Sequence, residues 1–301
     1  MSSAAALIAA ARERPVLLDG GLGTEVEAQG ARVDSALWSA RVLVDEPERV
    51  RAAHRAFAAA GARVAVTASY QVSASGFATA GLAAGLAERA LLDSVAVARE
   101  AHGGWVAASV GPYGASLADG SEYRGDDGLT EVELEEWHRP RLRTLASAAP
   151  DLLAIETIPS TREVRAIVAA LRGCPVPAWI SVSARRGRTA AGEPLAEAFA
   201  LAAAADEVIG IGVNCCPPGE VLEAIRVARA SSDKLVVVYP NGGEEWDADA
   251  RRWSGEPAFD PALVASWREA GAGLIGGCCR VGPAAIAALG HALETPASED
   301  S

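Results

Sequence analysis

The feature that most limits the fold of this 301-residue chain is the regular alternation of short apolar runs with longer segments of helical pattern. The apolar runs are mostly continuous, as is typical of strands in a parallel sheet that is covered on both faces. Eight such runs are predicted to be strands: Val16–Leu18, Arg63–Thr67, Trp105–Val110, Leu152–Glu156, Ala178–Ser183, Val208–Val213, Leu235–Tyr239 and Gly273–Ile275.

A helix-length segment follows each of these runs, and parallel neighbours require such a crossover. The predicted helices are Pro47–Ala60, Leu82–His102, Thr130–Ala148, Thr161–Leu171, Pro194–Asp206, Gly219–Ala230, Pro261–Ala270 and Pro283–Leu293. Thr130 and Glu133 have the spacing of a helix capping box. No composition break separates the units, so the sequence predicts an α/β fold, a single (β/α)8 TIM barrel over residues 1–293. A doubly wound open sheet is the alternative, and residues 294–301 are expected to form a disordered tail.

The charge balance excludes several classes of partner. The chain has 27 Lys and Arg against 39 Asp and Glu, and its net charge of -12 repels phosphate backbones and anionic lipid surfaces. No apolar run approaches the ~18 to 20 residues that span a bilayer. The early run Ala4–Ala11 has no basic residue before it and Arg12 directly after it, which favours an amphipathic first helix over a signal peptide. We therefore expect a cytoplasmic protein that binds neither nucleic acid nor membranes, with its five cysteines reduced.

The carboxyl ends of the predicted strands carry most of the candidate chemistry. The three longest connections, Gly20–Ala40, Gly111–Gly128 and Pro240–Glu256, follow strand ends, where barrel enzymes build their sites. The polar residues expected to converge there are Asp19, Thr67, Ser69, Ser109, Glu156, Ser183, Asn214, Cys215, Asn241, Cys278 and Cys279.

The cysteines at these strand ends suggest a metal site. Three thiolates from the sixth and eighth strands suit Zn²⁺, which takes cysteine sulfur in tetrahedral geometry. Adjacent strand residues point to opposite faces, so Cys278 and Cys279 can share a metal only where Gly276-Gly277 breaks the strand. The alternative is that these thiols are ordinary buried residues. Cys174 enters the fifth strand from the opposite end of the barrel and is expected to be structural.

Other kinds of site have less support. The four histidines, His54, His102, His138 and His291, all fall in or at the ends of predicted helices, so an imidazole ligand or a Ser-His-Asp triad has no obvious source. No dinucleotide or phosphate-binding glycine pattern is present. Two strand-end carboxylates remain, Asp19 and Glu156, which could act as acid and base, bind an ammonium group, or form a structural ion pair.

Nine segments of the chain closely resemble homocysteine S-methyltransferases, with the likeness running from about Val16 to Leu289. Two of them, Thr67-Ala68-Ser69-Tyr70-Gln71 and Ala118-Asp119-Gly120-Ser121-Glu122-Tyr123, resemble the branch that uses S-methylmethionine. The others are Leu18–Gly21, Leu37–Ala40, Ser109–Gly114, Glu156-Thr157, Val213-Asn214-Cys215, Val238–Asn241 and Gly276–Arg280.

This resemblance implies a TIM barrel whose Zn²⁺ is held by Cys215, Cys278 and Cys279, with Cys216 outside the matched motif. It implies that Asp19 and Glu156 bind the homocysteine amino group and that the Thr67–Ser69 backbone lies at its carboxylate. Asn214 is expected to complete the substrate site. Two stretches depart from the family pattern, Gly20–Thr24 and Arg185–Ala191, and the first could alter the pocket wall.

The expected reaction is zinc-dependent methyl transfer from S-methyl-L-methionine, and less well from S-adenosylmethionine, to L-homocysteine, giving L-methionine. Asp119 and Glu122 are expected to face the charges of the donor. Only small-molecule substrates are implied, without a protein partner. The alternatives are a structural zinc protein whose shell is closed by Cys216, or a thiol redox protein that uses Cys278 and Cys279.

Overall fold

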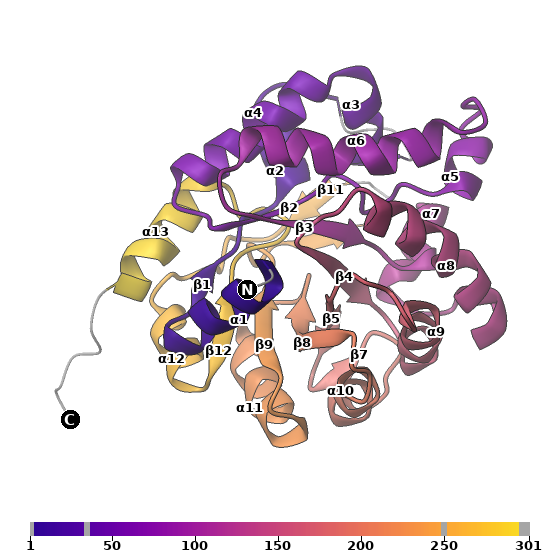
Figure 1. Cartoon of the computed structure of the whole chain (residues 1–301). Helices are drawn as coiled ribbons and strands as arrows, with labels where there is room; N and C mark the ends of the chain where they lie inside the picture. Colours follow the sequence, from indigo (N-terminus) through magenta and orange to yellow (C-terminus); the bar gives the residue numbers. More distant parts are fainter. Residues whose placement is uncertain (1–2, 33–36, 248–251, 295–301) are drawn as a thin grey trace, which may run out of the picture.

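Eight parallel strands form one sheet that closes on itself (Figure 1). The computed structural model describes residues 3–32, 37–247 and 252–294. The strand order is β1-β12-β9-β8-β5-β4-β3-β2, and a parallel bridge between Leu18 and Val64 joins the two outer strands. The predicted (β/α)8 barrel is therefore confirmed, and the open sheet is not formed.

Each of the eight predicted apolar runs forms a strand of this sheet. The strands are β1 (Val16–Leu17), β2 (Val64–Val66), β3 (Trp105–Val110), β4 (Leu152–Ile158), β5 (Ala178–Val182), β8 (Val208–Asn214), β9 (Leu235–Tyr239) and β12 (Ala272–Ile275).

The predicted helices form the outer ring, and an additional first helix, α1 (Ser3–Glu13), lies across one end of the barrel (Figure 1). The ring consists of α4 (Pro47–Ala59), α6 (Leu86–Ala101), α8 (Glu131–Ser147), α9 (Thr161–Leu171), α10 (Leu195–Ala203), α11 (Val221–Ser231), α12 (Leu263–Glu269) and α13 (Pro283–Glu294). The capping box at Thr130 and Glu133 is present. Helix α6 begins four residues later than predicted, because Gly85 adopts a left-handed conformation with φ 81°.

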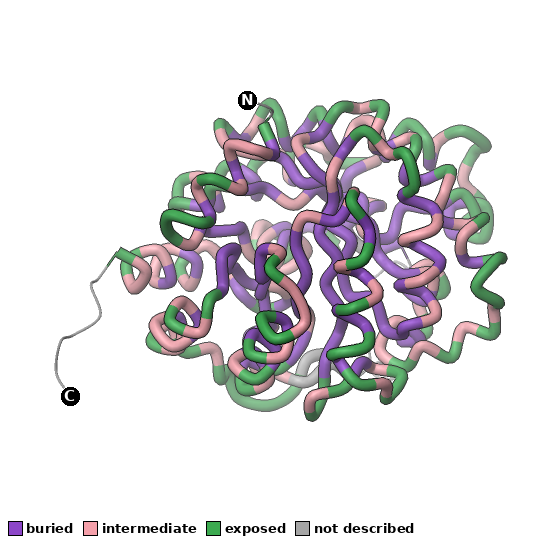
Figure 2. Tube along the Cα trace, turned by 60° about the horizontal axis from the view of Figure 1, so that its bottom comes forward, coloured by how far each residue is buried: buried purple, intermediate pink, exposed green. Residues whose placement is uncertain are grey.

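Side chains of successive strand residues enter two different cores. On β4, Leu152 and Ala154 belong to the cluster inside the barrel, whereas Leu153 and Ile155 pack outward against the helices. Leu7 of α1 joins the inner cluster and covers its amino-terminal end. This two-sided burial explains why the strands are apolar throughout, and Figure 2 shows the buried strands enclosed by half-exposed helices.

Short elements that the sequence did not predict occupy the connections. The helical ones are α2 (Leu22–Ala28), α3 (Trp38–Asp45), α5 (Ala74–Thr79), α7 (Tyr113–Leu117) and the single turns η1 (Ser121–Tyr123) and η2 (Pro218–Glu220). Two antiparallel hairpins are β6 (Ala184–Arg185) with β7 (Arg188–Thr189), and β10 (Glu245–Asp247) with β11 (Arg252–Ser254). The first, second and third long connections thus carry α2, α7 with η1, and the β10–β11 hairpin.

Helix α13 ends at Glu294, and residues 295–301 of the predicted tail lie outside the described residues. Within the described part of the chain, no helix has both the length and the apolar character needed to cross a membrane.

Candidate functional site

A cavity of about 100 Å³ lies at the carboxyl ends of the strands. Among the described residues, none of the side chains lining it is a lysine, arginine or histidine. Its ionisable lining residues are Asp19, Glu122, Glu156, Cys215, Cys278, Cys279, Tyr70, Tyr123 and Tyr239. A cavity lined by acids and thiols, without a basic group, favours ligands that bring positive charge.

Three thiols gather at one wall of the cavity. Cys215 Sγ lies 2.8 Å from Cys278 Sγ and 3.9 Å from Cys279 Sγ, and all three sulfurs lie within 4.8 Å of one another. Tetrahedral Zn–S bonds of ~2.3 Å place sulfurs roughly 3.8 Å apart, close to the longer of these distances. The shorter one exceeds a disulfide bond of ~2.05 Å. The predicted cluster is therefore present, and it could hold a metal ion.

The backbone leaves regular strand geometry where it presents these thiols. Cys215 follows β8 with φ 48°, a left-handed conformation that is uncommon outside glycine. After β12, a Cβ on Gly277 would lie 2.2 Å from Val281, so only glycine fits this turn. The Val281 N–H then donates to the Cys278 carbonyl at 3.1 Å. The strand has ended before Cys278, so adjacent Cys278 and Cys279 both reach Cys215, as the glycine pair predicted.

The three sulfurs share protons unequally. Hydrogen bonds with Cys278 and Cys279 hold the pKa of Cys215 well below its usual value. The same contacts with Cys215 raise the pKa values of Cys278 and Cys279. The cluster thus stabilises one thiolate between two thiols.

Asn214 lies behind the cluster rather than at the cavity surface. It is fully buried, and its Oδ1 accepts hydrogen bonds from the Thr157 N–H at 2.7 Å and the Ser181 hydroxyl at 3.0 Å. Its Nδ2 donates to Thr157 Oγ1 at 2.8 Å and lies 4.0 Å from Cys278 Sγ. Asn214 thereby joins the end of β4 to the end of β8 and supports the thiols.

Asp19 and Glu156 both line the cavity, and neither is exposed by more than 7%. The Val66 N–H donates to Asp19 Oδ2 at 2.8 Å, and the Ser109 hydroxyl donates to Glu156 Oε1. Burial raises the pKa of Glu156 to about 7, and burial together with the nearby Glu156 charge raises the pKa of Asp19. The structural ion pair considered from the sequence is not seen in the described part of the chain. The two acids therefore lack a protein cation.

Thr67 and Ser69 follow β2 and contact each other, with their hydroxyl oxygens 2.7 Å apart. Thr67 lines the cavity and accepts a hydrogen bond from the Ser109 N–H at 3.0 Å. Ser69 is fully buried and donates to the Ser109 carbonyl at 2.7 Å. Of the two, only Thr67 is among the described lining residues.

The Gly111–Gly128 connection brings one of its two predicted acids to the cavity. Glu122 lines it, and burial raises its pKa to about 7. Its Oε2 is buried and has no hydrogen-bond partner among the described residues. Asp119 is exposed instead, and its Oδ1 accepts from the Ser121 N–H at 3.0 Å and the Ser121 hydroxyl at 2.6 Å. Asp119 therefore orders the turn that carries Glu122.

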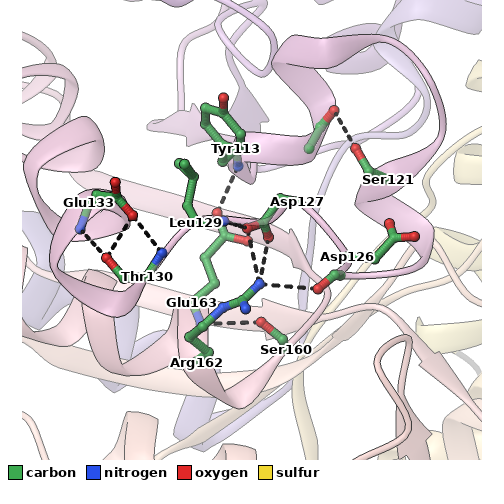
Figure 3. A network of polar contacts seen from close by, with 12 residues as sticks. Tyr113, Ser121, Asp126, Asp127, Leu129, Thr130, Glu133, Ser160, Arg162 and Glu163 are labelled. Carbon is green, nitrogen blue, oxygen red and sulfur yellow. Dashed lines mark hydrogen bonds and ion pairs between the residues drawn. The ribbon is translucent and has the colours of Figure 1, made fainter.

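Partly buried polar contacts fasten this connection to α9 (Figure 3). Arg162 Nη2 donates to both carboxylate oxygens of Asp127 at 3.0 Å. The Tyr113 N–H donates to Glu163 Oε1 at 2.7 Å, and His138 Nε2 lies 2.8 Å from the same oxygen. The Gly111–Gly128 connection, which carries Glu122, is thus held near both of its ends.

Three tyrosines in the cavity were missed as individual site residues. Tyr239 ends β9, Tyr70 follows β2, and Tyr123 lies in η1, where its hydroxyl is 3.8 Å from Cys215 Sγ. The Tyr239 hydroxyl contacts Ser181 Oγ at 2.7 Å and accepts from Trp179 Nε1 at 3.1 Å. All three lie in segments that carried the family resemblance, which was the available signal.

The remaining cysteines and the histidines stay outside the cavity lining. Cys216 is buried and not part of the thiol cluster, and burial raises its pKa. Cys174 packs against the outer core. The four histidines lie in or directly after helices, as predicted: His54, His102, His138 and His291.

The chain is similar over most of its length to proteins of one family. The family model described as homocysteine S-methyltransferase matches residues 16–293. The chain is 40% identical to homocysteine S-methyltransferase YbgG of Bacillus subtilis, over 93% of this chain and 96% of that protein. It is 41% identical to homocysteine S-methyltransferase of Escherichia coli, over 91% of this chain and 94% of that one.

Solved structures agree with the sequence comparison. The metallated form of the homocysteine methyltransferase MmuM from Escherichia coli superimposes with a TM-score of 0.82 at 39% identity, covering 92% of this chain and 95% of that chain. The oxidized form of the same protein gives a TM-score of 0.84 at 38% identity. With a thiol cluster and acidic cavity at the carboxyl end of a TIM barrel, and with these relatives along almost its whole length, the chain belongs to the homocysteine S-methyltransferase family.

Proposed function

We propose that the protein transfers a methyl group from S-methyl-L-methionine, and less well from S-adenosylmethionine, to L-homocysteine in a zinc-dependent reaction. The observation that carries this proposal is the composition of the cavity: three thiols and three carboxylates, with no basic residue among the described lining residues. Such a cavity suits a metal cation and two cationic amino-acid substrates.

The thiol cluster fits Zn²⁺ by its donor set and spacing. Cys215, Cys278 and Cys279 would hold the ion, and Asn214 would support Cys278 from behind. Zn²⁺ bound there would keep the homocysteine thiol deprotonated at neutral pH, where a free thiol of pKa ~8.5 is only ~3% ionised. The metallated form of the Escherichia coli relative supports this assignment.

Homocysteine would bind between the thiols and the two acids. Asp19 and Glu156 are buried without a protein cation, so an ammonium group would satisfy both. Thr67 lies beside them at the end of β2, where its backbone would face the substrate carboxylate. In this arrangement Ser69 and Asn214 act indirectly, since neither is among the lining residues.

The methyl donor would occupy the side of the cavity that carries Glu122. A buried carboxylate oxygen without a partner favours a cationic group, and sulfonium donors carry both a sulfonium and an ammonium charge. Asp119 would contribute through the turn it orders rather than by contact. S-methylmethionine needs only amino-acid recognition, whereas S-adenosylmethionine also needs a site for adenine and ribose, and no nucleotide-binding pattern is present in the sequence.

The transfer itself is a substitution at carbon. The homocysteine sulfur forms a bond to the methyl carbon while the bond from that carbon to the sulfonium sulfur breaks and leaves its electron pair there. From S-methylmethionine both products are methionine. Alignment of two bound reactants can supply ~7 to 11 kcal/mol, far more than the ~2 kcal/mol gained by ionising the thiol. The walls of the cavity therefore contribute mainly by orientation.

The alternatives have less support. A closed structural zinc site needs a fourth protein ligand, and Cys216 is not part of the described cluster. A redox role for Cys278 and Cys279 would need a disulfide that forms without loss of metal. The proposed zinc site requires reduced thiols, so the proposal includes a reducing, cytoplasmic location.

Methionine formation from homocysteine with the donors in competition at equal concentration, with and without zinc, tests the proposal. We expect the highest specificity constant for S-methylmethionine and a lower one for S-adenosylmethionine. We expect no turnover of betaine, because the thioether that leaves a sulfonium is a better leaving group than the tertiary amine that leaves betaine. A higher specificity constant for S-adenosylmethionine, or full activity after zinc removal, would contradict the proposal.

A further inference from the structure

A buried arginine outside the cavity lining holds two of the loops that form the cavity. Arg141 lies on α8, and only 5% of it is exposed. Its Nη1 donates to the Gly111 carbonyl at 3.0 Å, and its Nη2 donates to the Tyr70 carbonyl at 3.0 Å. Its guanidinium carbon lies 4.5 Å from the centre of the Trp137 ring.

These contacts are unusual for a buried cation. Among residues 3–32, 37–247 and 252–294, no carboxylate lies within 4.0 Å of the guanidinium, and its Nε has no hydrogen-bond partner. Burial lowers the pKa of Arg141 to about 10, so the charge is disfavoured at this position. A buried charge is not by itself evidence that a residue stabilises the fold. The two directed hydrogen bonds of Arg141 therefore need another explanation.

The two carbonyls belong to the turns after β2 and β3. The Gly111 N–H also donates to the Tyr70 carbonyl, at 3.2 Å. A Cβ on Gly111 would lie 2.6 Å from that carbonyl oxygen and 2.7 Å from two carbons of the Tyr70 ring. Glycine thus lets the second turn pack directly on the tyrosine, and Arg141 connects both turns to one helix.

Tyr70 connects the turn that Arg141 holds to the cavity. Tyr70 is among the lining residues, and its charged neighbours are Glu122, Cys215 and Glu156. The Thr157 side chain neighbours Tyr70 and opposes the rise of its pKa, and Thr157 Oγ1 accepts a hydrogen bond from Asn214 Nδ2 behind the thiols. Tyr70 therefore lies between the donor side of the cavity and the thiol cluster.

We propose that Arg141 is a positioning residue for methyl transfer, which acts through the backbone of Tyr70 and Gly111 to set the spacing between the donor and the thiols. The inference rests on the proposed function, in which the methyl donor occupies the side of the cavity that carries Glu122. A misplacement of about 1 Å by a mutation far from the reacting atoms can cost about 100-fold in rate.

The test compares Arg141→Met and Arg141→Lys with Arg143→Met, an exposed arginine on the same helix. Rates and Michaelis constants are measured with whichever donor the wild-type enzyme uses, so a wrong donor assignment is recognised before the variants are made. Zinc content and thermal unfolding are measured on the same samples.

We expect Arg141→Met to lose about 10- to 100-fold in kcat/KM for the donor, at unchanged zinc content and folded fraction. Arg141→Lys has a single ammonium in place of the planar fork and should lose less, and Arg143→Met should match the wild type. Should Arg141→Met not fold, Arg141→Lys is measured in its place. A loss that only follows the folded fraction, or no loss, would overturn the proposal.

A double-mutant cycle with Tyr70→Ala separates positioning from general weakening. If Arg141 acts by placing the Tyr70 ring through the backbone of that residue, the Arg141 substitution should change kcat/KM by less than about threefold when the ring is already absent. Full additivity of the two losses would show that Arg141 does not act through Tyr70.

Discussion

Two groups of buried ionisable residues lie near the carboxyl-terminal loops, and they differ in the partners that the protein supplies. In the cavity, Asp19, Glu122 and Glu156 have no basic partner among the described lining residues. In the other group, Glu163 Oε1 accepts a hydrogen bond from the Tyr113 N–H (Figure 3). The same oxygen contacts His138 Nε2, so Glu163 has protein partners at this oxygen, while its Oε2 has none among the described residues.

Under the proposed function, the difference separates residues that would bind a ligand from residues that hold the fold. A buried acid without a cationic partner has a raised pKa, as Asp19, Glu122 and Glu156 do, and under the proposed function the positive charges of the substrates would pair with these acids. The Glu163 group has its partners within the fold and fastens α7 and α8 to α9. Substitutions in the two groups should therefore have different consequences.

The largest effect is expected at the thiols. Cys215→Ala, Cys278→Ala and Cys279→Ala should each lose stoichiometric zinc, and activity should fall by more than the roughly 10- to 100-fold that loss of an outer partner costs. Zinc analysis and methionine formation measure both. Cys174→Ala and Cys216→Ala are the matched controls and should retain both, whereas full activity in Cys215→Ala would disprove a zinc-thiolate site.

Substitution of Glu163 should mainly lower the stability of the fold and should affect the cavity less. Glu163→Ala leaves the Tyr113 N–H and His138 without their acceptor and should lower the free energy of unfolding by about 3 kcal/mol, because two hydrogen bonds to a buried carboxylate are lost. Glu163→Gln keeps an acceptor and should recover part of this loss. Urea unfolding measures the free energy of unfolding of each variant. Equal stability of Glu163→Ala and the wild type would contradict the structural role of Glu163.

Substitution of a cavity acid should affect substrate binding instead. Glu156→Gln should raise the homocysteine Michaelis constant about 10- to 100-fold, because one charged hydrogen bond to the ammonium group is lost. Steady-state kinetics at saturating donor measure it. A lower maximal rate with unchanged homocysteine saturation, titrating with a carboxyl pKa, would assign Glu156 a proton-transfer role instead.

The smallest effect at neutral pH concerns a buried base that belongs to neither group. His54 on α4 is fully buried, neither ring nitrogen has a partner in the described part of the chain, and burial lowers its pKa to about 3. Below pH ~6.5 the unfolded state therefore binds a proton that the folded state excludes, and stability should fall as pH decreases toward 3. His54→Leu should reduce this slope by at most about 1.4 kcal/mol per pH unit.

Chemical unfolding between pH 7 and 4.5 measures the slope. His291→Leu, on the last helix, is the control, since that histidine is exposed. An identical slope in His54→Leu and the wild type would mean that His54 does not contribute.

Much of the site was predictable because a barrel brings strand ends together. Once eight strands were recognised, Asp19, Glu156 and Cys215 had to share one face. The roles of individual polar residues were harder to predict from the sequence. Asp119, Ser69 and Asn214 have the residue types of substrate ligands, yet each makes its hydrogen bonds to neighbouring protein groups.

The sequence by itself determined the barrel and the three thiols, because continuous apolar runs, helix-length spacers and a glycine pair before Cys278 are local signals. Only the tertiary structure decided which polar side chains reach the cavity. That choice depends on left-handed backbone at Thr157 and Cys215, with φ 60° and 48°, and on Arg141 meeting two distant carbonyls. Neither residue type nor spacing specifies such conformations, since packing of other strands and helices supplies the energy that holds them.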